Sequence, residues 1–349
     1  MAQPFSLKTL QFTGQATRIA ESVGSLQGVP GFSVSANGTL VYRKGSNAQN
    51  LQLAWFDRSG KLIQTVGQAG GFISPSLAPD GKRITVHRHE GAGGDIWLAA
   101  DGETFSRFTF DASQDNSTPI WSPDGGLIAF GSLRHGKWGI YEKPSDGARS
   151  EHLLIESDAL SMPMSWSPDG KYLVYYILDP KTSTDLWALP LTGDRKPFPV
   201  AQTVSSENHA QISPDGRWIA LNSDESGPSQ IYVKPFPSGQ GKWQASTTFG
   251  IFPRWRRDGK ELFYMESTDG GRMMSVDVKA TGDAMVFSQP HVLFDSGYYN
   301  INHSTNWLAY DVSQDGQRFL IARPEGTLTN PIEDTPMTVV LNWTAGLKK

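Results

Sequence analysis

The sequence contains no cysteine among its 349 residues. This absence excludes disulfide bonds, thiolate nucleophiles and cysteine-based metal sites, but it is compatible with either side of a membrane. No apolar run reaches the 18 or so residues of a membrane-spanning helix. The opening segment MAQPFSLKTLQFTGQATRIAES also lacks the charged start and long apolar run of a signal peptide. The residues themselves therefore predict no membrane span and no export signal, and they leave the compartment open.

An excess of basic charge is missing as well. The formal net charge is −4, and no long run of lysine and arginine exists. A nucleic-acid partner would require such a basic footprint, so we expect none. Glycine (36) and proline (22) are plentiful, without a collagen-like period. This composition indicates many turns, and hence many short elements.

Convincing amphipathic helices are absent too, and a repeated turn takes their place. Seven of the Asn-Gly and Asp-Gly pairs mark this turn, beginning at residues 37, 80, 124, 169, 215, 258 and 315. Successive marks are 43, 44, 45, 46, 43 and 57 residues apart. Such a period is typical of propeller repeats, in which each unit of about 40–45 residues supplies one four-stranded blade.

The sequence around each mark reads as a hairpin followed by two further strands. A short apolar strand, often ending in tryptophan, leads into a turn such as Ser122-Pro123-Asp124-Gly125. Proline presets φ there, aspartate bonds its own backbone, and glycine accepts a positive φ. A second apolar strand, a third strand and a more polar fourth strand complete the unit.

We therefore predict an all-β fold, a single seven-bladed β-propeller domain spanning 1–349 and built of four-stranded antiparallel blades. The ring would be closed by N- and C-terminal strands. Residues 1–6 and 337–343 are rivals for one strand position. The predicted blades cover 29–67, 72–110, 117–156, 162–201, 209–246, 252–295, and 307–343 with an outer strand from 16–23.

The W-S-P-D-G-x-x-I-A-F pattern resembles the TolB-type, WD-like propeller repeats of bacteria. Four further segments, LAWFDRSGKLIQTVG (53–67), SRFTFD (106–111), PRWRRDGKELFY (253–264) and TVVLNWTAGLKK (338–349), resemble the C-terminal propeller of bacterial serine/threonine protein kinases. The resemblance implies an extracytoplasmic, sensor-like module. The Gly-rich loop, V-A-I-K, H-R-D and D-F-G motifs of a kinase are missing, so kinase activity is not implied.

Catalytic and metal-binding alternatives have weaker signals. No G-x-S-x-G pentapeptide of an α/β-hydrolase is present. The isolated aspartates of the turns do not form a D-x-D-x-D-G calcium loop, and His87 and His89 share a strand face without an evident third ligand. We expect no cofactor and no metal. A carboxylate pair for a glycoside hydrolase or lyase stays open as the alternative, with Asp115, Asp158, Glu207 and Asp224 as contributors.

The loops that lead into the blades differ from one another, and variable loops on a regular frame often carry function. We expect these loops to form one mouth of the channel and to present an exposed aromatic or apolar patch. The leading prediction is a non-catalytic module that binds a protein, peptide or small-molecule ligand there, as part or derivative of a signalling kinase. The predicted binding residues are Asp115, Asn116, Met162, Asn208, His209, Phe252, Tyr298, Tyr299 and His303.

Overall fold

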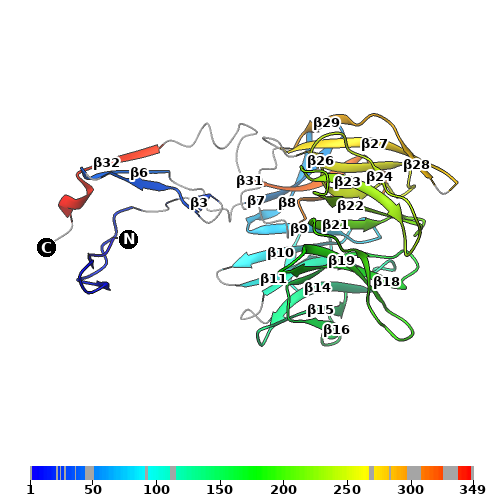
Figure 1. Cartoon of the computed structure of the whole chain (residues 1–349), viewed down its shortest axis with the longest axis horizontal. Coiled ribbons are helices and arrows are strands. Elements are labelled where there is room, and N and C mark those ends of the chain that lie inside the picture. Colours follow the sequence, from blue (N-terminus) through cyan, green and yellow to red (C-terminus); the bar gives the residue numbers. More distant parts are fainter. Residues whose placement is uncertain are drawn as a thin grey trace. The chain divides into compact units, whose positions relative to one another are not determined.

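The structure is a computed structural model of the whole chain (Figure 1). It describes residues 2–20, 23, 25–26, 29–35, 37–43, 51–90, 93–110, 115–266, 271–282, 284–296, 308–324 and 337–346. The chain divides into two compact units. The larger unit comprises 51–299 and 304–325, and the smaller comprises 1–50, 300–303 and 326–349. This division differs from the predicted single domain over 1–349.

Six antiparallel sheets of at least four strands make up the described part of the larger unit. Five of them follow the chain as meanders, and one of these has β29 as an extra strand on β27. Their strands are β9 (Phe72–Leu77), β10 (Ile84–Glu90), β11 (Gly93–Ala99), β12 (Phe105–Arg107); β13 (Asp115–Trp121), β14 (Leu127–Arg134), β15 (Lys137–Pro144), β16 (His152–Ser157); β17 (Ser161–Trp166), β18 (Tyr172–Asp179), β19 (Ser183–Pro190), β20 (Phe198–Ala201); β21 (Glu207–Ile212), β22 (Trp218–Ser223), β23 (Gln230–Pro235), β24 (Trp243–Gln244); β25 (Ile251–Trp255), β26 (Glu261–Glu266), β27 (Arg272–Thr281), β28 (Ala284–Phe287), β29 (His291–Asp295).

The sixth sheet joins the two ends of the larger unit. Its order is β30 (Tyr310–Val312), β31 (Arg318–Pro324), β7 (Leu51–Asp57) and β8 (Leu62–Gly70). The predicted blade 29–67 is therefore corrected, because β7 pairs with β31 and β8, rather than with the hairpin before it. The predicted last blade is corrected for the same reason: β31 hydrogen-bonds to β7 over seven residue pairs, and 337–343 and 16–23 take no part.

The smaller unit holds a three-stranded sheet in the order β32 (Met337–Leu341), β6 (Thr39–Arg43), β5 (Phe32–Val34). It also contains two hairpins whose strands have two residues each: β1 (Phe5–Ser6) with β2 (Gln11–Phe12), and β3 (Ser25–Leu26) with β4 (Val29–Pro30). A 3₁₀ turn, η1, spans Trp343–Gly346. Within 16–23, Thr17 forms an isolated bridge with Ala2. No helix of the described residues is long and apolar enough to cross a membrane.

The repeated turn takes the form that its residues predict. In the turn at 122–125 the backbone N–H of Gly125 donates to the Ser122 carbonyl over 2.9 Å, with Gly125 at φ 70°. The Asp124 carboxylate accepts from Ser122 Oγ (2.6 Å) and from the Gly126 N–H (2.9 Å). The Ser122 hydrogen bond is the main reason why the pKa of Asp124 lies below its ordinary value. These aspartates fix hairpins, and the carboxylate acts as an acceptor within its own turn.

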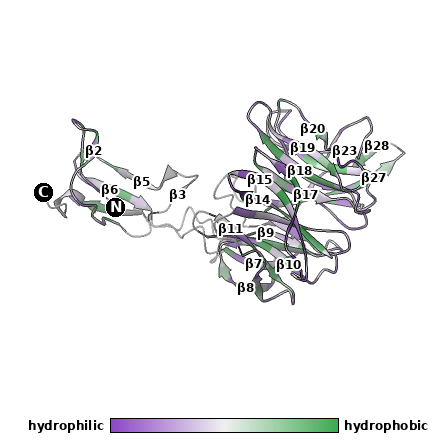
Figure 2. Cartoon of the chain, turned by 90° about the horizontal axis from the view of Figure 1, so that it is seen from below, coloured by the Kyte–Doolittle hydropathy of each residue, from purple (hydrophilic) through white to green (hydrophobic). Residues whose placement is uncertain are grey.

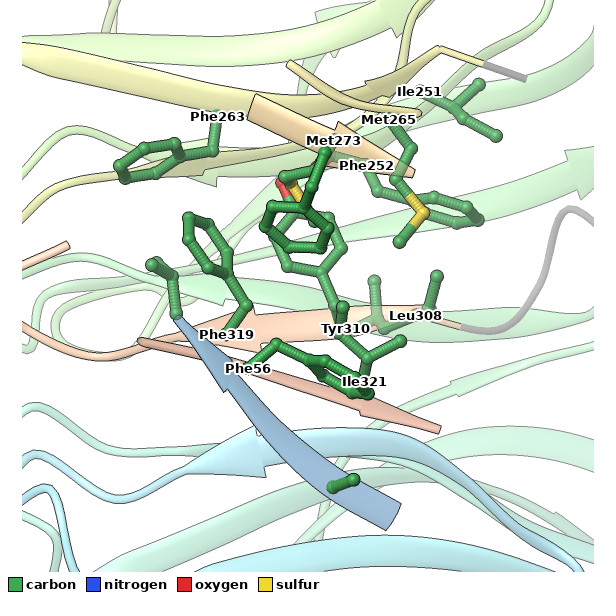
Figure 3. Close-up of a cluster of buried hydrophobic side chains, with 14 residues drawn as sticks. Phe56, Ile251, Phe252, Phe263, Met265, Met273, Leu308, Tyr310, Phe319 and Ile321 are labelled. Carbon is green, nitrogen blue, oxygen red and sulfur yellow. The ribbon is translucent and has the colours of Figure 1, made fainter. Parts of the chain in front are cut away.

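Apolar side chains fill the spaces between neighbouring sheets. Hydrophobic residues gather on the strands, and hydrophilic residues on many of the connecting loops (Figure 2). One large cluster lies between β25–β27 and the sheet of β30, β31 and β7, where Tyr310, Phe319, Phe263 and Phe252 are buried (Figure 3). The inner strand of each sheet contacts that of the next: β9 with β13, then β17, β21, β25, β30 and again β9. The inner strand of each sheet therefore contacts inner strands of other sheets.

Candidate binding cavity

One position recurs in the inner strand of all six sheets. It is the residue four places before the turn aspartate, and we call the set of six the inner ring: Ser76, Ile120, Ser165, Gln211, Arg254 and Asp311. All six line one cavity of about 390 Å³. Residues of the repeated turns, such as Pro123, Pro168 and Pro214, line the same cavity, so it lies at the turn end of the sheets.

A bulge in the inner strands helps to aim these side chains. The pairing register shifts between Ser117 and Ile120, between Asn208 and Gln211, and between Ile251 and Arg254. The residue two places before the inner-ring position has a positive φ in several sheets, at 53° for Thr118 and 58° for Phe252. A bulge inserts one residue and turns the following side chain. The inner-ring residue therefore directly follows the bulge in these three sheets.

Inner-ring side chains also cap backbone groups of the next sheet. An inner strand has a partner strand on one side only, which leaves backbone N–H groups that need acceptors. Ser165 Oγ accepts from the Ile212 N–H (3.0 Å), and Gln211 Oε1 accepts from the Trp255 N–H (2.6 Å). Asp311 Oδ2 accepts from the Leu77 N–H (2.8 Å). These hydrogen bonds hold the cavity wall rigid.

Two tryptophans reinforce the same joints. Trp121 Nε1 donates to the Ser76 carbonyl, and Trp255 Nε1 donates to the Gln211 carbonyl, both over 3.1 Å. Each indole thus spans from its own sheet to the inner ring of the preceding sheet. Trp166 also lines the cavity. These three tryptophans therefore form part of the cavity wall.

Charge in the cavity comes from three side chains, Arg254, Arg257 and Asp311. Arg254 is only 4% exposed, and its Nε lies 3.5 Å from Asp311 Oδ1. Its Nη1 donates to the Pro253 carbonyl over 2.9 Å. Burial raises the pKa of Asp311, although Arg254 and the N–H groups of Leu77 and Val312 oppose this shift. Arg257 is exposed at the rim.

The residues predicted from the variable loops lie elsewhere. Asp115 and Asn116 begin β13, Met162 lies in β17, Asn208 and His209 lie in β21, and Phe252 lies in β25. None of these six lines the cavity. Tyr298, Tyr299 and His303 fall outside the described residues.

Five of these six predicted residues are buried, and Asp115 is partly exposed. Ser132 Oγ donates to Asn116 Oδ1 over 2.7 Å, and the rings of His209 and Phe252 are 4.3 Å apart. The Ser117 hydroxyl donates a hydrogen bond to Met162 Sδ over 3.2 Å. The expected exposed patch containing Met162 and Phe252 is therefore corrected, because the starts of the inner strands pack between sheets.

The carboxylates of the hydrolase alternative are spread over several elements. Asp115 begins β13, Asp158 follows β16, and Glu207 begins β21. Asp224 follows β22 and accepts from the Ser206 N–H over 2.8 Å. Burial raises the pKa of Glu207, and Asp185 adds to this effect. Within the described ranges, no group of three or more His, Asp or Glu side chains is placed to hold a metal ion.

Comparison with known proteins establishes the fold. No family model matches the chain. An uncharacterized protein of Agrobacterium fabrum is 26% identical over 257 residues, which cover 72% of this chain and 84% of that protein. The solved structure of a proposed TolB from Agrobacterium tumefaciens superposes with a TM-score of 0.63 at 21% identity, covering 81% of this chain and all of the other.

A second solved structure, a proposed 6-phosphogluconolactonase from Bacteroides fragilis, superposes with a TM-score of 0.51 at 14% identity, covering 80% of this chain and 89% of the other. At these identities the likeness shows the fold alone. The chain has a TolB-like, all-β propeller fold, which confirms the predicted fold class at that level.

Inner-ring residues were missed by the sequence argument, although a signal for them existed. They stand at a fixed distance before every turn aspartate, directly before Trp121, Trp166 and Trp255 in three repeats. The loop sequences vary along their whole length, whereas the inner ring varies at one position of a regular strand. Its composition (two serines, Ile, Gln, Arg and Asp) is the more informative variation.

Proposed function

We propose that the chain is a non-catalytic binding module, and that its site is the cavity surrounded by the inner ring. The observation that carries the proposal is the convergence of six equivalent side chains, one from each sheet, on one cavity. Their chemistry differs from sheet to sheet while their position repeats. A regular frame with a variable lining is the usual design of a binding site on a repeat scaffold.

The occupant that we propose is a segment of a partner protein. A volume of about 390 Å³ is within the usual range for ligand pockets and would hold a few side chains of a peptide. Hydrogen bonds between sheets hold Gln211 and Ser165 in place before any ligand arrives. Such preorganisation lowers the entropic cost of binding. The TolB-like fold supports this assignment, since it is compatible with a binding role.

We further propose that the six sheets close into one ring of six blades. The sheet order β30-β31-β7-β8 supports this, because the last and first strands of the larger unit share one sheet. Two hydrogen bonds also join that sheet to β9: Leu77 N–H to Asp311 Oδ2 (2.8 Å) and Leu308 N–H to Ser74 Oγ (3.1 Å). A seventh blade would then be missing. The remaining strands of the predicted first and last blades, β5, β6 and β32, form a separate sheet.

A relation to bacterial signalling kinases remains a proposal that rests on the resemblance of segments such as 338–349. The DNA sequence upstream of the Met1 codon tests it directly. An in-frame kinase domain and membrane helix would make the chain part of such a kinase, and a stop codon with a ribosome-binding site just upstream would make it a free propeller.

The binding proposal is tested by panning a displayed library of random peptides on the isolated chain. We expect enriched peptides to lose binding to Ser76→Phe and to Ile120→Phe, which place a larger side chain in the cavity. Val204→Ser is the matched control, because Val204 is 91% exposed and does not line the cavity. Circular dichroism checks that each variant folds. Failure to enrich peptides, or enrichment indifferent to both phenylalanine variants, would overturn the proposal.

A further inference from the structure

The cavity has a net positive charge, although the chain is acidic. Arg254 and Arg257 outnumber Asp311, the one acidic residue of the lining, whereas the whole chain carries −4. Charges inside a walled cavity are screened less than charges on an open surface. The lining therefore favours an anionic group over a cationic one.

Three inner-ring side chains already accept hydrogen bonds from backbone N–H groups. Asp311 Oδ2 accepts from the Leu77 N–H and Oδ1 from the Val312 N–H, each within 2.9 Å. Gln211 Oε1 accepts from the Trp255 N–H over 2.6 Å, which also fixes the orientation of the amide. Ser165 Oγ accepts from the Ile212 N–H. A ligand that donates hydrogen bonds would have to compete with these backbone groups.

The donor groups of the inner ring are mostly free. Gln211 Nε2 and the Ser165 hydroxyl have no acceptor among the described residues. The Arg254 guanidinium has five N–H donors. Its Nη1 donates to a carbonyl, and its Nε is 3.5 Å from Asp311, longer than a strong charge-assisted hydrogen bond. Ser165, Gln211 and Arg254 are inner-ring members of three consecutive sheets, so their donors form one arc.

Apolar side chains line the cavity beside these donors. Ile120 and Trp121 come from the sheet that precedes that of Ser165, and Trp166 directly follows Ser165. A ligand that fits both features carries an anionic acceptor group next to an apolar one. A carboxylate beside an aliphatic side chain has this chemistry.

We infer that the cavity recognises a carboxylate group of the partner, bound by the donors of Ser165, Gln211 and Arg254, with Arg257 attracting it at the rim. This inference rests on the proposed function, because it names the chemistry that the same cavity selects. The carboxylate has two sources in a protein, the chain terminus and an Asp or Glu side chain. Both present two acceptor oxygens in one plane, which match the fork of an arginine.

Three small probes distinguish these sources. They are N-acetyl-leucyl-leucine with a free carboxylate, N-acetyl-leucyl-glutamic acid amide, and N-acetyl-leucyl-leucine amide as the uncharged control. Binding is followed by the ¹H–¹⁵N signals of the tryptophan indoles, since Trp121 and Trp255 line the cavity. We expect at least one carboxylate probe to bind about tenfold or more tightly than the amide, as expected for hydrogen bonds to a charged group.

Gln211→Glu is the decisive variant. A carboxylate at 211 keeps an oxygen for the Trp255 N–H and replaces the free donor with an acceptor, so the fold is preserved while the preference for a carboxylate is lost. We expect it to weaken the carboxylate probes about tenfold or more and to leave the amide unchanged. Arg257→Gln, at an exposed rim position, should weaken them by a smaller factor.

The inference and the proposed function fail in different ways. If the uncharged amide binds as tightly as both carboxylate probes, or if Gln211→Glu leaves their affinity unchanged, the carboxylate inference is overturned. Suppose that the enriched peptides lose binding to the phenylalanine variants, lack acidic groups and still bind Gln211→Glu. That result would overturn the carboxylate inference and support the binding proposal. The binding proposal itself would be overturned if the enriched peptides bound Ser76→Phe and Ile120→Phe as tightly as the natural chain.

Discussion

Trp255 Nε1 donates a hydrogen bond to the backbone carbonyl of Gln211 over 3.1 Å, and the backbone N–H of Trp255 donates to the side chain of the same glutamine. The first atom pair joins side chain to backbone and the second joins backbone to side chain. Together they lock β25 onto β21 at the level of the cavity. Trp121 makes the equivalent indole bond to Ser76. The tryptophan of the repeat is therefore a polar joint between sheets as well as an apolar filler.

Replacing this indole should cost more than replacing a tryptophan that lacks the bond. Trp255 and Trp218 are buried to a similar degree, at 5% and 3% exposed, but Trp218 Nε1 has no hydrogen-bond partner among the described residues. We expect Trp255→Phe to lower the free energy of unfolding by about 1 kcal/mol more than Trp218→Phe does. Urea unfolding followed by circular dichroism measures both. Equal losses in the two variants would contradict the assigned role.

Glu261 should be one of the most sensitive charged positions. It is buried in β26, where Arg58 Nη2 approaches its Oε1 at 2.6 Å and Arg256 Nη1 its Oε2 at 2.7 Å. Arg58 directly follows β7, so this pair connects strands 203 residues apart in the chain. We expect Glu261→Gln to lower the free energy of unfolding by about 3 kcal/mol, because it leaves two arginines without their shared carboxylate.

The same site gives a pH dependence of known sign. Burial alone would raise the pKa of Glu261, but hydrogen bonds from Arg58 and Ser275 and the charges of both arginines outweigh burial and lower it. A carboxyl with a lowered folded pKa adds stability above its ordinary value of 4.5, and this stability is lost as the pH falls through the folded pKa. The stability gap between the natural chain and Glu261→Gln should therefore narrow below pH 4.5. A gap that stays constant from pH 7 to pH 3 would refute this explanation.

Glu207 should show the opposite pH dependence. Burial raises its pKa, and this effect outweighs the hydrogen bonds from Thr203, whose Oγ1 lies 2.5 Å from Oε1. An acid with a raised folded pKa contributes its stability below the ordinary value of 4.5 and loses it as the pH rises through the folded pKa. We expect Glu207→Gln to be more stable than the natural chain at pH 8 and equal to it near pH 4.

Denaturant unfolding at both pH values measures this difference, and Asp158→Asn provides the control at an exposed carboxylate. If Glu207→Gln were less stable than the natural chain at pH 8, the folded protein would stabilise the charged carboxylate. That result would contradict a raised pKa for Glu207.

Sequence reasoning succeeded where the cause is local. The turn at 122–125 is specified by four adjacent residues, and the structure has the expected glycine with positive φ and the aspartate that caps its own turn. The all-β class and the four-stranded sheets follow from repeating that turn with short apolar strands on each side. These features need no knowledge of which strands meet across long distances.

Strand partners at the junction of the repeats could not be predicted in the same way. The hairpins β5–β6 and β30–β31 share the same pattern, an Asn-Gly or Asp-Gly turn between apolar strands. Either could place its second strand against β7. Proximity in sequence favours β6, but the structure pairs β31 with β7 and β6 with β32. The choice depends on packing over the whole unit, which the local pattern does not encode.

The candidate cavity was missed for a related reason. Whether Gln211 lies at a strand centre or in a cavity depends on the bulge before it, and the role of its amide depends on Trp255 in another sheet. A sequence shows only that the position varies among repeats.

The pairing of β31 with β7 is open to a direct chemical test, because the natural chain has no cysteine. Gln52 and Arg323 are opposite each other in this pair, so cysteines at both positions can form one bridge and no other. We expect Gln52→Cys/Arg323→Cys to form an intramolecular disulfide on mild oxidation. The bridge should raise the free energy of unfolding by about 2–4 kcal/mol, since it closes a loop of nearly the whole larger unit. Mass spectrometry after proteolysis identifies the linked peptides, and each single-cysteine variant serves as a control for intermolecular bonds. Absence of the intramolecular bridge in a folded double variant would contradict the pairing of β31 with β7. It would favour the alternative in which β7 pairs with β6, the strand that precedes it in the sequence.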